Sequence, residues 1–341
     1  MPDNQTMYRD WAAAAERAIV TRHLRRVWGL PGTVLGRSGW PPTPDQRVHW
    51  RWNYWWQAHL LDCLVDAQHR DPTTARAATI DRFTGSIRLR NFGKWTNDYY
   101  DDMAWLGLAM QRTGRDVEVL LEQLRGAWTP EGGGGIWWRK GDRFKNAPSN
   151  GPAAILHARA GETQRARELF EWMNLTLADP ATGLVWDGLH VDSGEVVRMI
   201  YTYCQGVFLG TCVELSEMDA AARTIRAVAA HCAPGGVLLG QGGGDGGLFA
   251  GILARYLALG AQRLPPGPEA DAARDLVLGS ATACWKGATD ARGGPLFSAD
   301  WSVPAPRSPA GDPARDLSVQ VGAWLLLEAA ATLSSHTNRD A

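Results

Sequence analysis

The chain is organised around the stretch Lys94-Trp95-Thr96-Asn97-Asp98-Tyr99-Tyr100-Asp101-Asp102-Met103-Ala104-Trp105. From Tyr99 onward, apolar residues recur at helical spacing as far as Met110. This spacing predicts a helix that runs to about Arg112, because Gly114 is a residue commonly found just past a helix end. The predicted helix therefore begins among the acidic residues of the stretch.

Two adjacent carboxylates, Asp101 and Asp102, fall in or next to the first turn of this helix, and Asp98 is a candidate N-cap. The helix dipole favours one ionised carboxylate there. Like-charge repulsion moves the neighbouring carboxyl toward its protonated form. One ionised and one protonated acid side by side are the groups that glycoside hydrolysis requires. Acidic residues in a first turn are also common dipole partners, so the motif alone leaves both interpretations open.

About twelve helical patterns recur along the 341 residues, and no convincing pair of strands accompanies them. We expect these helices at about 6–28, 46–69, 73–91, 99–112, 115–127, from 148, 163–177, 195–216, 218–232, 246–259, 267–286 and 314–335. Their connections alternate in length. Short turns enter the odd-numbered helices, whereas segments rich in Gly and Trp enter the even-numbered ones, at 29–45, 91–97 (the shortest), 129–147, 179–194, 231–245 and 287–313.

This alternation predicts an all-α fold, an (α/α)6 barrel of six helical hairpins with the even-numbered helices as its inner ring. The long loops would gather at one mouth, where the inner helices begin, and long loops on a compact domain usually carry function. We expect a single domain over residues 1–341. A less regular helical array or a solenoid is the alternative, although no internal repeat gives a solenoid strong support.

The composition limits the partners that the chain can have. A formal net charge of −1 gives no sign of a nucleic-acid or anionic-membrane partner. No apolar run approaches the length of a membrane span, and no secretory signal is visible at the N-terminus. The five cysteines are widely spaced and form no metal-ligand cluster, so we expect no metal and no cofactor. A reducing cytoplasm is the simplest location, although a secreted chain trimmed of its signal peptide would look the same. The sequence leaves the oligomeric state open.

Tryptophan is unusually frequent, with 17 Trp against 7 Tyr and 7 Phe. Most are expected in the core, but an indole in a loop offers a flat apolar face and one N–H donor, which suits stacking on sugar rings. The predicted mouth collects carboxylates, amides and indoles, namely Trp40, Trp95, Asp98, Asp101, Asp102, Trp137, Trp138, Arg139, Lys145, Asn150, Trp186, Asp187, His190, Gln241, Asp245, Asp300 and Trp301. This mixture suits a neutral polyhydroxylated ligand better than phosphate or nucleic acid.

Motifs for other chemistries are incomplete in this sequence. The glycine run 132–135 lacks the Gly-Lys-Ser/Thr ending of a phosphate loop, and the run 241–247 lacks the strand that precedes a dinucleotide fingerprint. No Gly-x-Ser-x-Gly elbow of a serine hydrolase occurs. We expect His59 to be a hydrogen-bonded core histidine and Cys204 a buried helical thiol.

Several motifs resemble the glycoside hydrolase family 76 α-1,6-mannanases, in the same order and over roughly residues 50–260. The strongest match is Asn97-Asp98-Tyr99-Tyr100-Asp101-Asp102-Met103-Ala104-Trp105. Further matches are Tyr54-Trp55-Trp56-Gln57-Ala58-His59, Gly134-Gly135-Ile136-Trp137-Trp138, Lys145-Asn146-Ala147-Pro148-Ser149-Asn150-Gly151-Pro152, Leu184-Val185-Trp186-Asp187-Gly188, Tyr201-Thr202-Tyr203-Cys204-Gln205-Gly206 and Gly243-Gly244-Asp245-Gly246-Gly247-Leu248-Phe249.

The resemblance implies an (α/α)6 barrel, in agreement with the helix pattern, and retaining hydrolysis of α-1,6-mannosidic linkages in mannan or mannooligosaccharides. On the matching positions Asp101 would be the nucleophile and Asp102 the general acid/base. A retaining mechanism needs carboxyl groups about 5–5.5 Å apart, which neighbouring side chains at a helix start can provide. Mannose would be held by Asp98, Tyr99, Trp138, Asn150, Asp187, Gln205 and Asp245. The chain departs from the expected motifs at Cys204, where the resemblance implies Asn, and at Met103, where Glu is common.

Two alternatives keep the barrel and change the function. Sugar epimerases of the N-acylglucosamine 2-epimerase type also use (α/α)6 barrels, but they work with histidine pairs, and His59 and His190 are the candidates here. The other alternative is a carbohydrate-binding relative without catalytic activity. The sequence leaves open whether cleavage is internal or from a chain end.

Overall fold

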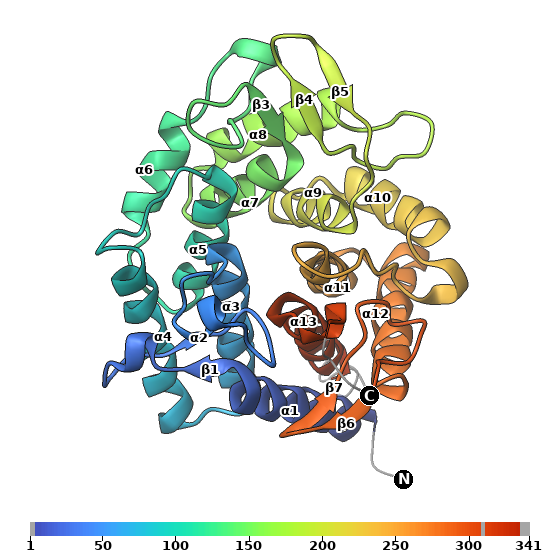
Figure 1. The fold of residues 1–341 in the computed structure, drawn as a ribbon. Helices are drawn as coiled ribbons and strands as arrows, with labels where there is room; N and C mark the ends of the chain where they lie inside the picture. Colours follow the sequence, from blue (N-terminus) through green and yellow to red (C-terminus); the bar gives the residue numbers. More distant parts are fainter. Residues whose placement is uncertain (1–3, 308–310, 335–341) are drawn as a thin grey trace.

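The computed structural model describes residues 4–307 and 311–334, and its helices form two concentric rings (Figure 1). The inner ring consists of α3 (Tyr54–Arg70), α5 (Tyr100–Arg112), α7 (Ala147–Arg159), α9 (Thr202–Glu214), α11 (Gly246–Arg263) and α13 (Leu317–Ser334). The outer ring consists of α1 (Asn4–His23), α4 (Thr74–Arg90), α6 (Glu118–Gly126), α8 (Thr163–Thr176), α10 (Met218–His231) and α12 (Pro268–Lys286). Each inner helix contacts the next and α13 contacts α3, so the ring closes. The expected (α/α)6 barrel is confirmed.

The two rings differ in how their helices bury side chains. Outer helix α10 buries one side, at Ala220, Ala221, Thr224, Ile225, Ala227 and Val228, as expected for a helix with its other face in water. Inner helix α13 buries side chains all round, because it has neighbours on both sides. By length and composition α13 could cross a membrane, in contrast to the expectation that no segment reaches that length. However, 83% of it is buried inside the barrel, which is typical of a core helix.

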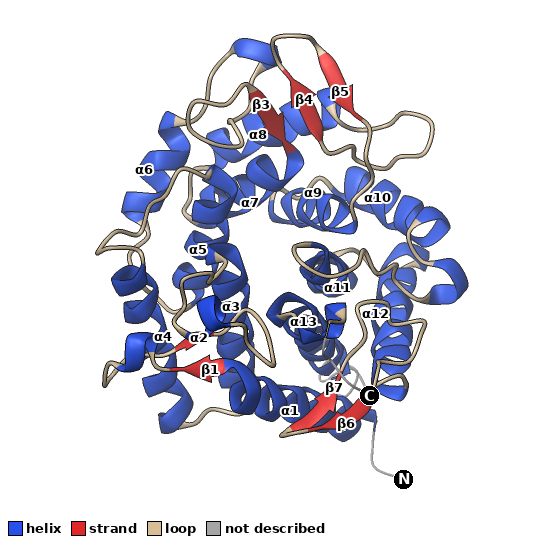
Figure 2. Cartoon of the chain, viewed as in Figure 1, coloured by secondary structure: helices blue, strands red, loops and turns tan. Residues whose placement is uncertain are grey.

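Short strands connect the helices at the mouth, where the sequence indicated none (Figure 2). They form three antiparallel sheets: β1 (Leu24–Arg25) with β2 (Leu35–Gly36), β3 (Phe144–Asn146) with β4 (Gly188–His190) and β5 (Glu195–Val197), and β6 (Thr289–Ala291) with β7 (Gly294–Leu296). Strands of two or three residues are too short to show a period of two. The expected helix at 195–216 was wrong at its start for this reason, since 195–197 is β5.

Shorter helical elements complete the loops. They are α2 (Pro44–Arg47) and the 3₁₀ turns η1 (Val27–Gly29), η2 (Glu131–Gly133), η3 (Pro234–Gly236) and η4 (Pro313–Arg315). The helix expected at 46–69 therefore begins later, at Tyr54, because α2 and a turn precede it.

Glycines allow two inner helices to touch backbone to backbone. A Cβ placed on Gly251 of α11 would lie 2.4 Å from the carbonyl oxygen of Gly322 in α13. A Cβ on Gly322 would lie 2.1 Å from the carbonyl oxygen of Gly247. Any side chain at either position would push the helices apart. The small residues therefore fix the place of the α11 N-terminus, which carries Asp245 into the mouth.

An amide side chain at the fourth residue of four inner helices anchors the loop that precedes each helix. The amides are Gln57 in α3, Asn150 in α7, Gln205 in α9 and Gln320 in α13. Each oxygen accepts from a loop N–H and each NH₂ donates to the carbonyl of that same loop residue, which is Gly36, Ile136, Val185 or Phe297 respectively. All four amides are fully buried. Buried paired amides of this kind hold the mouth loops in register with the inner ring.

Candidate active site

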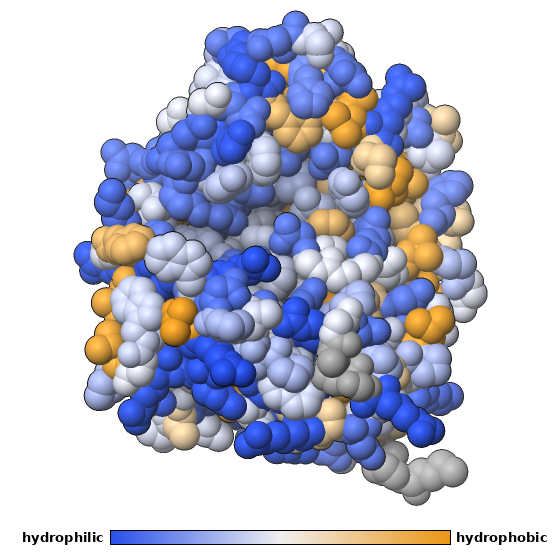
Figure 3. Space-filling view, in the orientation of Figure 1, coloured by the Kyte–Doolittle hydropathy of each residue, from blue (hydrophilic) through white to orange (hydrophobic). Residues whose placement is uncertain are grey.

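Asp101 and Asp102 lie in the first turn of α5, at the mouth of the barrel. The mouth is the central hollow in Figure 3, and hydrophilic side chains dominate its walls. The helix begins at Tyr100, whose N–H donates to the carbonyl of Trp138 at 2.9 Å. Asp98 does not cap the helix, in contrast to the prediction, because the N-cap position is Tyr99 and no side chain bonds there. The loop before α7 therefore fixes where the acidic turn begins.

Asp101 is held by two hydrogen-bond donors. Its Oδ1 accepts from the backbone N–H of Asp102 at 2.9 Å, and its Oδ2 accepts from the indole Nε1 of Trp138 at 3.1 Å. Burial raises the pKa of Asp101 to about 7, while these two donors act in the opposite direction by stabilising the ionised form. The charge of Asp245 raises the pKa further.

Asp102 is bound by a single side chain, Asn97, whose Nδ2 donates to Oδ2 at 2.6 Å. Asn97 is itself positioned by its Oδ1, which accepts from the N–H of Tyr99 at 2.9 Å. Burial and then repulsion from Asp101 raise the pKa of Asp102 well above its ordinary value. Because Asp101 has the stronger set of donors, it ionises first and Asp102 keeps its proton. Asn97 lies inside the quoted stretch, but nothing in the sequence pattern distinguished it from a loop residue.

Asp245 joins this site from the opposite side of the ring. Its Oδ1 accepts from two indoles of α3, Trp55 Nε1 at 3.0 Å and Trp56 Nε1 at 2.8 Å. Its charge raises the pKa of both Asp101 and Asp102, so the loop before α11 reaches the acidic turn of α5. The two tryptophans were missed as site residues, since helical position and apolar character are equally typical of core indoles.

An aromatic floor lies between the carboxylates. Tyr203 of α9 stacks on Phe249 of α11, with ring centroids 3.9 Å apart and planes within 1°. Trp55 lies beside both rings, at 6.4 Å from Tyr203 and 6.3 Å from Phe249. Burial raises the pKa of the Tyr203 hydroxyl, and the charges of Asp101, Asp187 and Asp245 add to this shift. Tyr203 therefore stands among three carboxylates and offers a flat face to a ligand.

Asp187, in the segment before β4, lies near Tyr203 in the same site. Its backbone is fixed in two directions, because its carbonyl accepts from Ala147 N and its N–H donates to Val197 O. Burial raises the pKa of its carboxyl to about 6, with His190 acting in the opposite direction. Within residues 4–307 and 311–334, no hydrogen bond to this carboxyl is formed, so both oxygens are available to a ligand.

Two of the residues expected to bind substrate, Asn150 and Gln205, lie in the core, whereas substrate binding by Asp98 stays a prediction. Asn150 and Gln205 are fully buried, and their amides bond the loop carbonyls and N–H groups described above. They therefore hold the loops of the site in place and do not face a ligand. Asp98 is exposed, and its backbone carbonyl accepts from Lys140 N. Tyr99 and Trp138 do reach the site, with their rings 5.4 Å apart. The amide positions were misjudged because a buried amide clamp and a ligand-binding amide have the same sequence signature.

Other polar residues of the predicted mouth hold the loops together. Lys145 is buried, and its Nζ donates to four oxygens of residues 129–134, among them Gly134 O at 2.7 Å. Gln241 accepts from Thr202 N at 2.8 Å and so fixes the start of α9. Cys204 is fully buried, as expected. No group of three or more His, Cys, Asp or Glu in the described part of the chain is arranged to hold a metal ion.

The two histidines of the epimerase alternative have separate surroundings. His59 is buried against Trp55 and Trp105, with ring centroids 5.5 and 4.6 Å away. Burial lowers its pKa to about 3, and its Nε2 has no partner among the described residues, so it is not hydrogen-bonded there as expected. His190 is exposed and packs against Phe144. An uncharged buried histidine and an exposed one on different walls do not form a catalytic pair.

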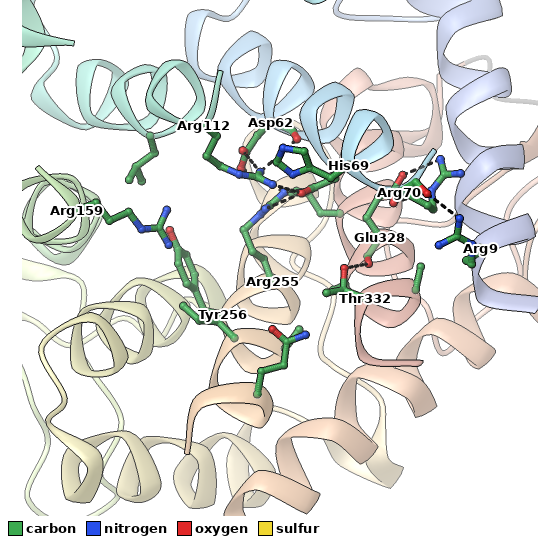
Figure 4. Close-up of a pocket in the computed structure, with 18 residues that line it drawn as sticks. Arg9, Asp62, His69, Arg70, Arg112, Arg159, Arg255, Tyr256, Glu328 and Thr332 are labelled. Atoms are coloured by element: carbon green, nitrogen blue, oxygen red, sulfur yellow. Dashed lines mark hydrogen bonds and ion pairs between the residues drawn. The ribbon is translucent and has the colours of Figure 1, made fainter. Parts of the chain in front are cut away.

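A second cavity, of about 510 Å³, lies at the opposite end of the barrel, where the inner helices end (Figure 4). Its walls carry ion pairs among Asp62, Asp66, Arg112 and Arg255. Asp101 and Asp102 are at the other end of α5 and do not line it. This end of the ring is therefore built from paired charges, whereas the mouth contains carboxylates without basic partners.

Comparison with known proteins adds to this geometry. Residues 11–334 match the sequence model of glycosyl hydrolase family 76. The chain is similar to the GH76A α-1,6-mannanase from Salegentibacter sp. HEL1_6, with 30% identity, a TM-score of 0.85, and coverage of 96% of this chain and 99% of that one. An inactive variant of that enzyme, with two consecutive aspartates replaced by asparagine, forms a complex with α-1,6-mannotriose; it is 29% identical, has a TM-score of 0.84 and covers the same shares.

A third solved structure is the Lin0763 protein from Listeria innocua, with 26% identity, a TM-score of 0.83, and coverage of 96% of this chain and 97% of that one. A search of curated proteins found no match. The family model spans nearly the whole helical barrel, including both catalytic carboxylate candidates and the loops around them. The chain belongs to glycosyl hydrolase family 76.

Proposed function

We propose that this chain is a retaining glycosidase that hydrolyses α-1,6-mannosidic linkages in mannan or mannooligosaccharides. The observation that carries the proposal is the pair Asp101 and Asp102, which are adjacent, half-buried at the mouth and unequal in their hydrogen bonds. They are the only two consecutive aspartates in the sequence. The 29% identical relative that is inactive has two consecutive aspartates replaced, which supports the same role for this pair.

In this mechanism Asp101 attacks the anomeric carbon while the bond from that carbon to the leaving sugar breaks. Asp102 gives its proton to the departing oxygen, and a covalent mannosyl ester on Asp101 results. Water then attacks the same carbon, Asp102 takes the proton of the water, and the ester bond breaks. Two inversions at one carbon retain its configuration. The roles follow from the donors, because Trp138 and the backbone N–H of Asp102 keep charge on Asp101 while Asp102 stays protonated.

The remaining groups of the mouth suit a neutral sugar chain. Tyr203 stacks on Phe249 with one face, and its other face can support a pyranose ring, while Asp187 and Asp245 offer carboxylate oxygens to the hydroxyls of that ring. Tyr99 and Trp138 close the side next to Asp101. A mannooligosaccharide has many hydroxyls and no charge, so it needs acceptors and flat apolar faces, which this wall supplies.

The test of the proposal is incubation with α-1,6-mannotetraose, followed by ¹H NMR of the first product formed. Release of shorter mannooligosaccharides with the new reducing end first in the α form is expected, because a double displacement retains configuration. An initial β product would show a single displacement and contradict the assignment of Asp101 as nucleophile. Binding of the tetraose without any cleavage would contradict the enzymatic function itself and favour a carbohydrate-binding relative.

The pH dependence of kcat/KM provides a second test of the roles. Asp101 must be ionised and has a pKa of about 7, so kcat/KM is expected to fall about tenfold per pH unit below that value. The rate falls again at higher pH, where Asp102 loses its proton. Trp138→Phe removes a donor to Asp101 and should move the acid limb to higher pH. Trp137→Phe is the matched control, because the Trp137 ring lies against Arg143 and Lys145. Identical acid limbs in both variants would contradict this view of Asp101.

A further inference from the structure

A basic pocket of about 560 Å³ lies outside the catalytic mouth, beside β1 and α2. Four arginines line it, Arg25, Arg26, Arg37 and Arg47, together with Trp28 and Val48, and no acidic residue lines it. In Figure 3, strongly hydrophilic side chains gather over β1 in the lower left part of the face. The chain as a whole has a net charge of −1, so this concentration of positive charge is local.

These arginines have no carboxylate partners. Many other arginines of the chain form ion pairs, such as Arg51 with Asp45, but within residues 4–307 and 311–334 none of the four does. Arg25 donates only to the backbone oxygens of Thr21 and Leu24. The Nε of Arg37 is buried and has no partner in the described structure. Burial, and then repulsion from Arg25 and Arg47, lower the pKa of Arg37. An anion in the pocket would reduce the repulsion among the arginines and could accept a hydrogen bond from the Nε of Arg37.

Trp28 gives the pocket a flat apolar wall in an unusual backbone conformation. Its φ is +51° and its ψ is +23°, in the left-handed region that bulky residues rarely occupy. The side chain is 47% exposed, although it is one of the largest apolar groups of the chain. Arg90 holds its ring by a cation–π contact at 5.7 Å. Strain of this kind is typical of residues fixed in place for a ligand, and an indole face suits the apolar face of a sugar ring.

The pocket is joined to the catalytic mouth through the first turn of α3. Arg37 directly follows Gly36, whose N–H and C=O are both bound by the amide of Gln57. In the same turn, Trp55 and Trp56 hold Asp245 of the mouth. The pocket and the mouth thus belong to the same end of the barrel, where a glycan that extends out of the mouth can reach the pocket.

We propose that this pocket binds a phosphorylated sugar unit of the glycan, with the arginines on the phosphate and Trp28 on the sugar ring. Guanidinium groups match phosphate oxygens in geometry and charge, and four of them without a counter-ion favour a dianion over a neutral ligand. The identity of the glycan rests on the proposed function, whereas the recognition of the phosphate group rests on the pocket alone.

Binding is tested by titration calorimetry with mannose 6-phosphate, inorganic phosphate and mannose, and by ³¹P NMR with the two phosphates. Mannose 6-phosphate is expected to bind more tightly than inorganic phosphate, and mannose should give no signal from this pocket. Arg37→Gln and Arg47→Gln should each weaken mannose 6-phosphate about tenfold. Trp28→Ala should weaken mannose 6-phosphate and leave inorganic phosphate unchanged. Arg263→Gln, the loss of an exposed arginine at the other end of α11, is the matched control for general charge effects.

Three outcomes would overturn the proposal. They are unchanged binding in both arginine variants, equal weakening by Arg263→Gln, and equal affinity for both phosphates with no effect of Trp28→Ala, which would indicate a site for free phosphate. Hydrolysis separates this inference from the proposed function. Arg37→Gln should cleave neutral α-1,6-mannotetraose at the wild-type rate but show a raised KM on a phosphorylated α-1,6-mannan. If the wild-type protein cleaves no mannooligosaccharide, the proposed function is wrong. The ³¹P titration still shows whether the pocket binds the phosphorylated sugar.

Discussion

Asp101→Asn is expected to lower kcat on α-1,6-mannotetraose on the order of a thousandfold or more, because the amide cannot form the covalent intermediate. Asp102→Asn is expected to lower it by about 10² to 10⁴-fold, the usual contribution of a general acid. The two variants are expected to differ in their response to a substrate with a better leaving group. An aryl α-mannobioside with a good leaving group needs no proton, so it should restore the first step in Asp102→Asn only. The measurement is kcat and KM for both substrates in both variants.

Azide separates the two roles by stereochemistry. In Asp101→Ala, azide can attack the anomeric carbon directly, which inverts it and gives a β-mannosyl azide. In Asp102→Ala, azide attacks the mannosyl ester on Asp101, and a second inversion gives an α-mannosyl azide. The opposite pattern would exchange the roles of the two residues. Asp116→Asn is a matched control, because Asp116 also serves a helix start, accepting from Glu118 N at 2.9 Å in outer helix α6. Its kcat should equal that of the wild type.

The stability of the same variants distinguishes a catalytic pair from simple partners of the helix dipole. The pKa of Asp101 is about 7 in the folded chain and about 3.9 in the unfolded one, so between these values only the unfolded state is ionised. Ionisation then favours unfolding, and stability falls as the pH rises through this window. Above pH 7, Asp101→Asn should therefore melt at a higher temperature than the wild type. A carboxylate that only stabilised the helix would show a lower melting temperature on replacement.

Helix spacing and loop length were sufficient to predict the barrel. Both features are visible in the sequence, because the short turns fix which helices pair and the long loops mark the ends at which the inner helices begin. What could not be predicted depends on contacts between distant segments. The strands β3 and β4 pair Phe144 with His190, and neither segment is long enough to show a strand pattern by itself. The start of α9 was misplaced for the same reason.

In the candidate site, too, local motifs could be predicted from the sequence, whereas contacts between distant segments could not. Asp101 and Asp102 were recognisable because the chemistry lies in one local stretch. The attachment of Asp245 to Trp55 and Trp56 joins residues about 190 positions apart and becomes visible only in the folded chain. Asn150 and Gln205 show the reverse error, since local patterns suggested ligand contacts where the fold uses these amides to hold backbone. A sequence pattern indicates which groups are present, but the fold decides which of them remain free.

Arg255→Met is expected to lower the free energy of unfolding by about 3 kcal/mol, because it leaves two partly buried carboxylates to one arginine. Arg255 and Arg112 both pair with Asp62 and Asp66 at the end of the barrel opposite the mouth (Figure 4), with Arg255 at 3.2 Å from Asp62. Burial opposes ionisation of Asp62, but the two arginines outweigh it and hold the pKa of this carboxyl below its ordinary value. Urea denaturation at pH 7 measures the loss.

The exposed ion pair between Arg115 and Asp81 is the matched control. Arg115→Met should lower the free energy of unfolding by no more than about 1 kcal/mol, since water screens exposed ion pairs. The contribution of the buried network should also disappear as the pH falls through the ordinary range of aspartate toward the lowered pKa of Asp62, because in this window the unfolded chain binds the proton and the folded chain does not. Equal losses for Arg255→Met and Arg115→Met would show that this network closes the ring without stabilising it. Arg255 lies at the far end of the inner ring from Asp101 and Asp102, which occupy the first turn of α5. Arg255→Met should therefore leave the acid limb of kcat/KM unchanged, whereas Trp138→Phe moves it.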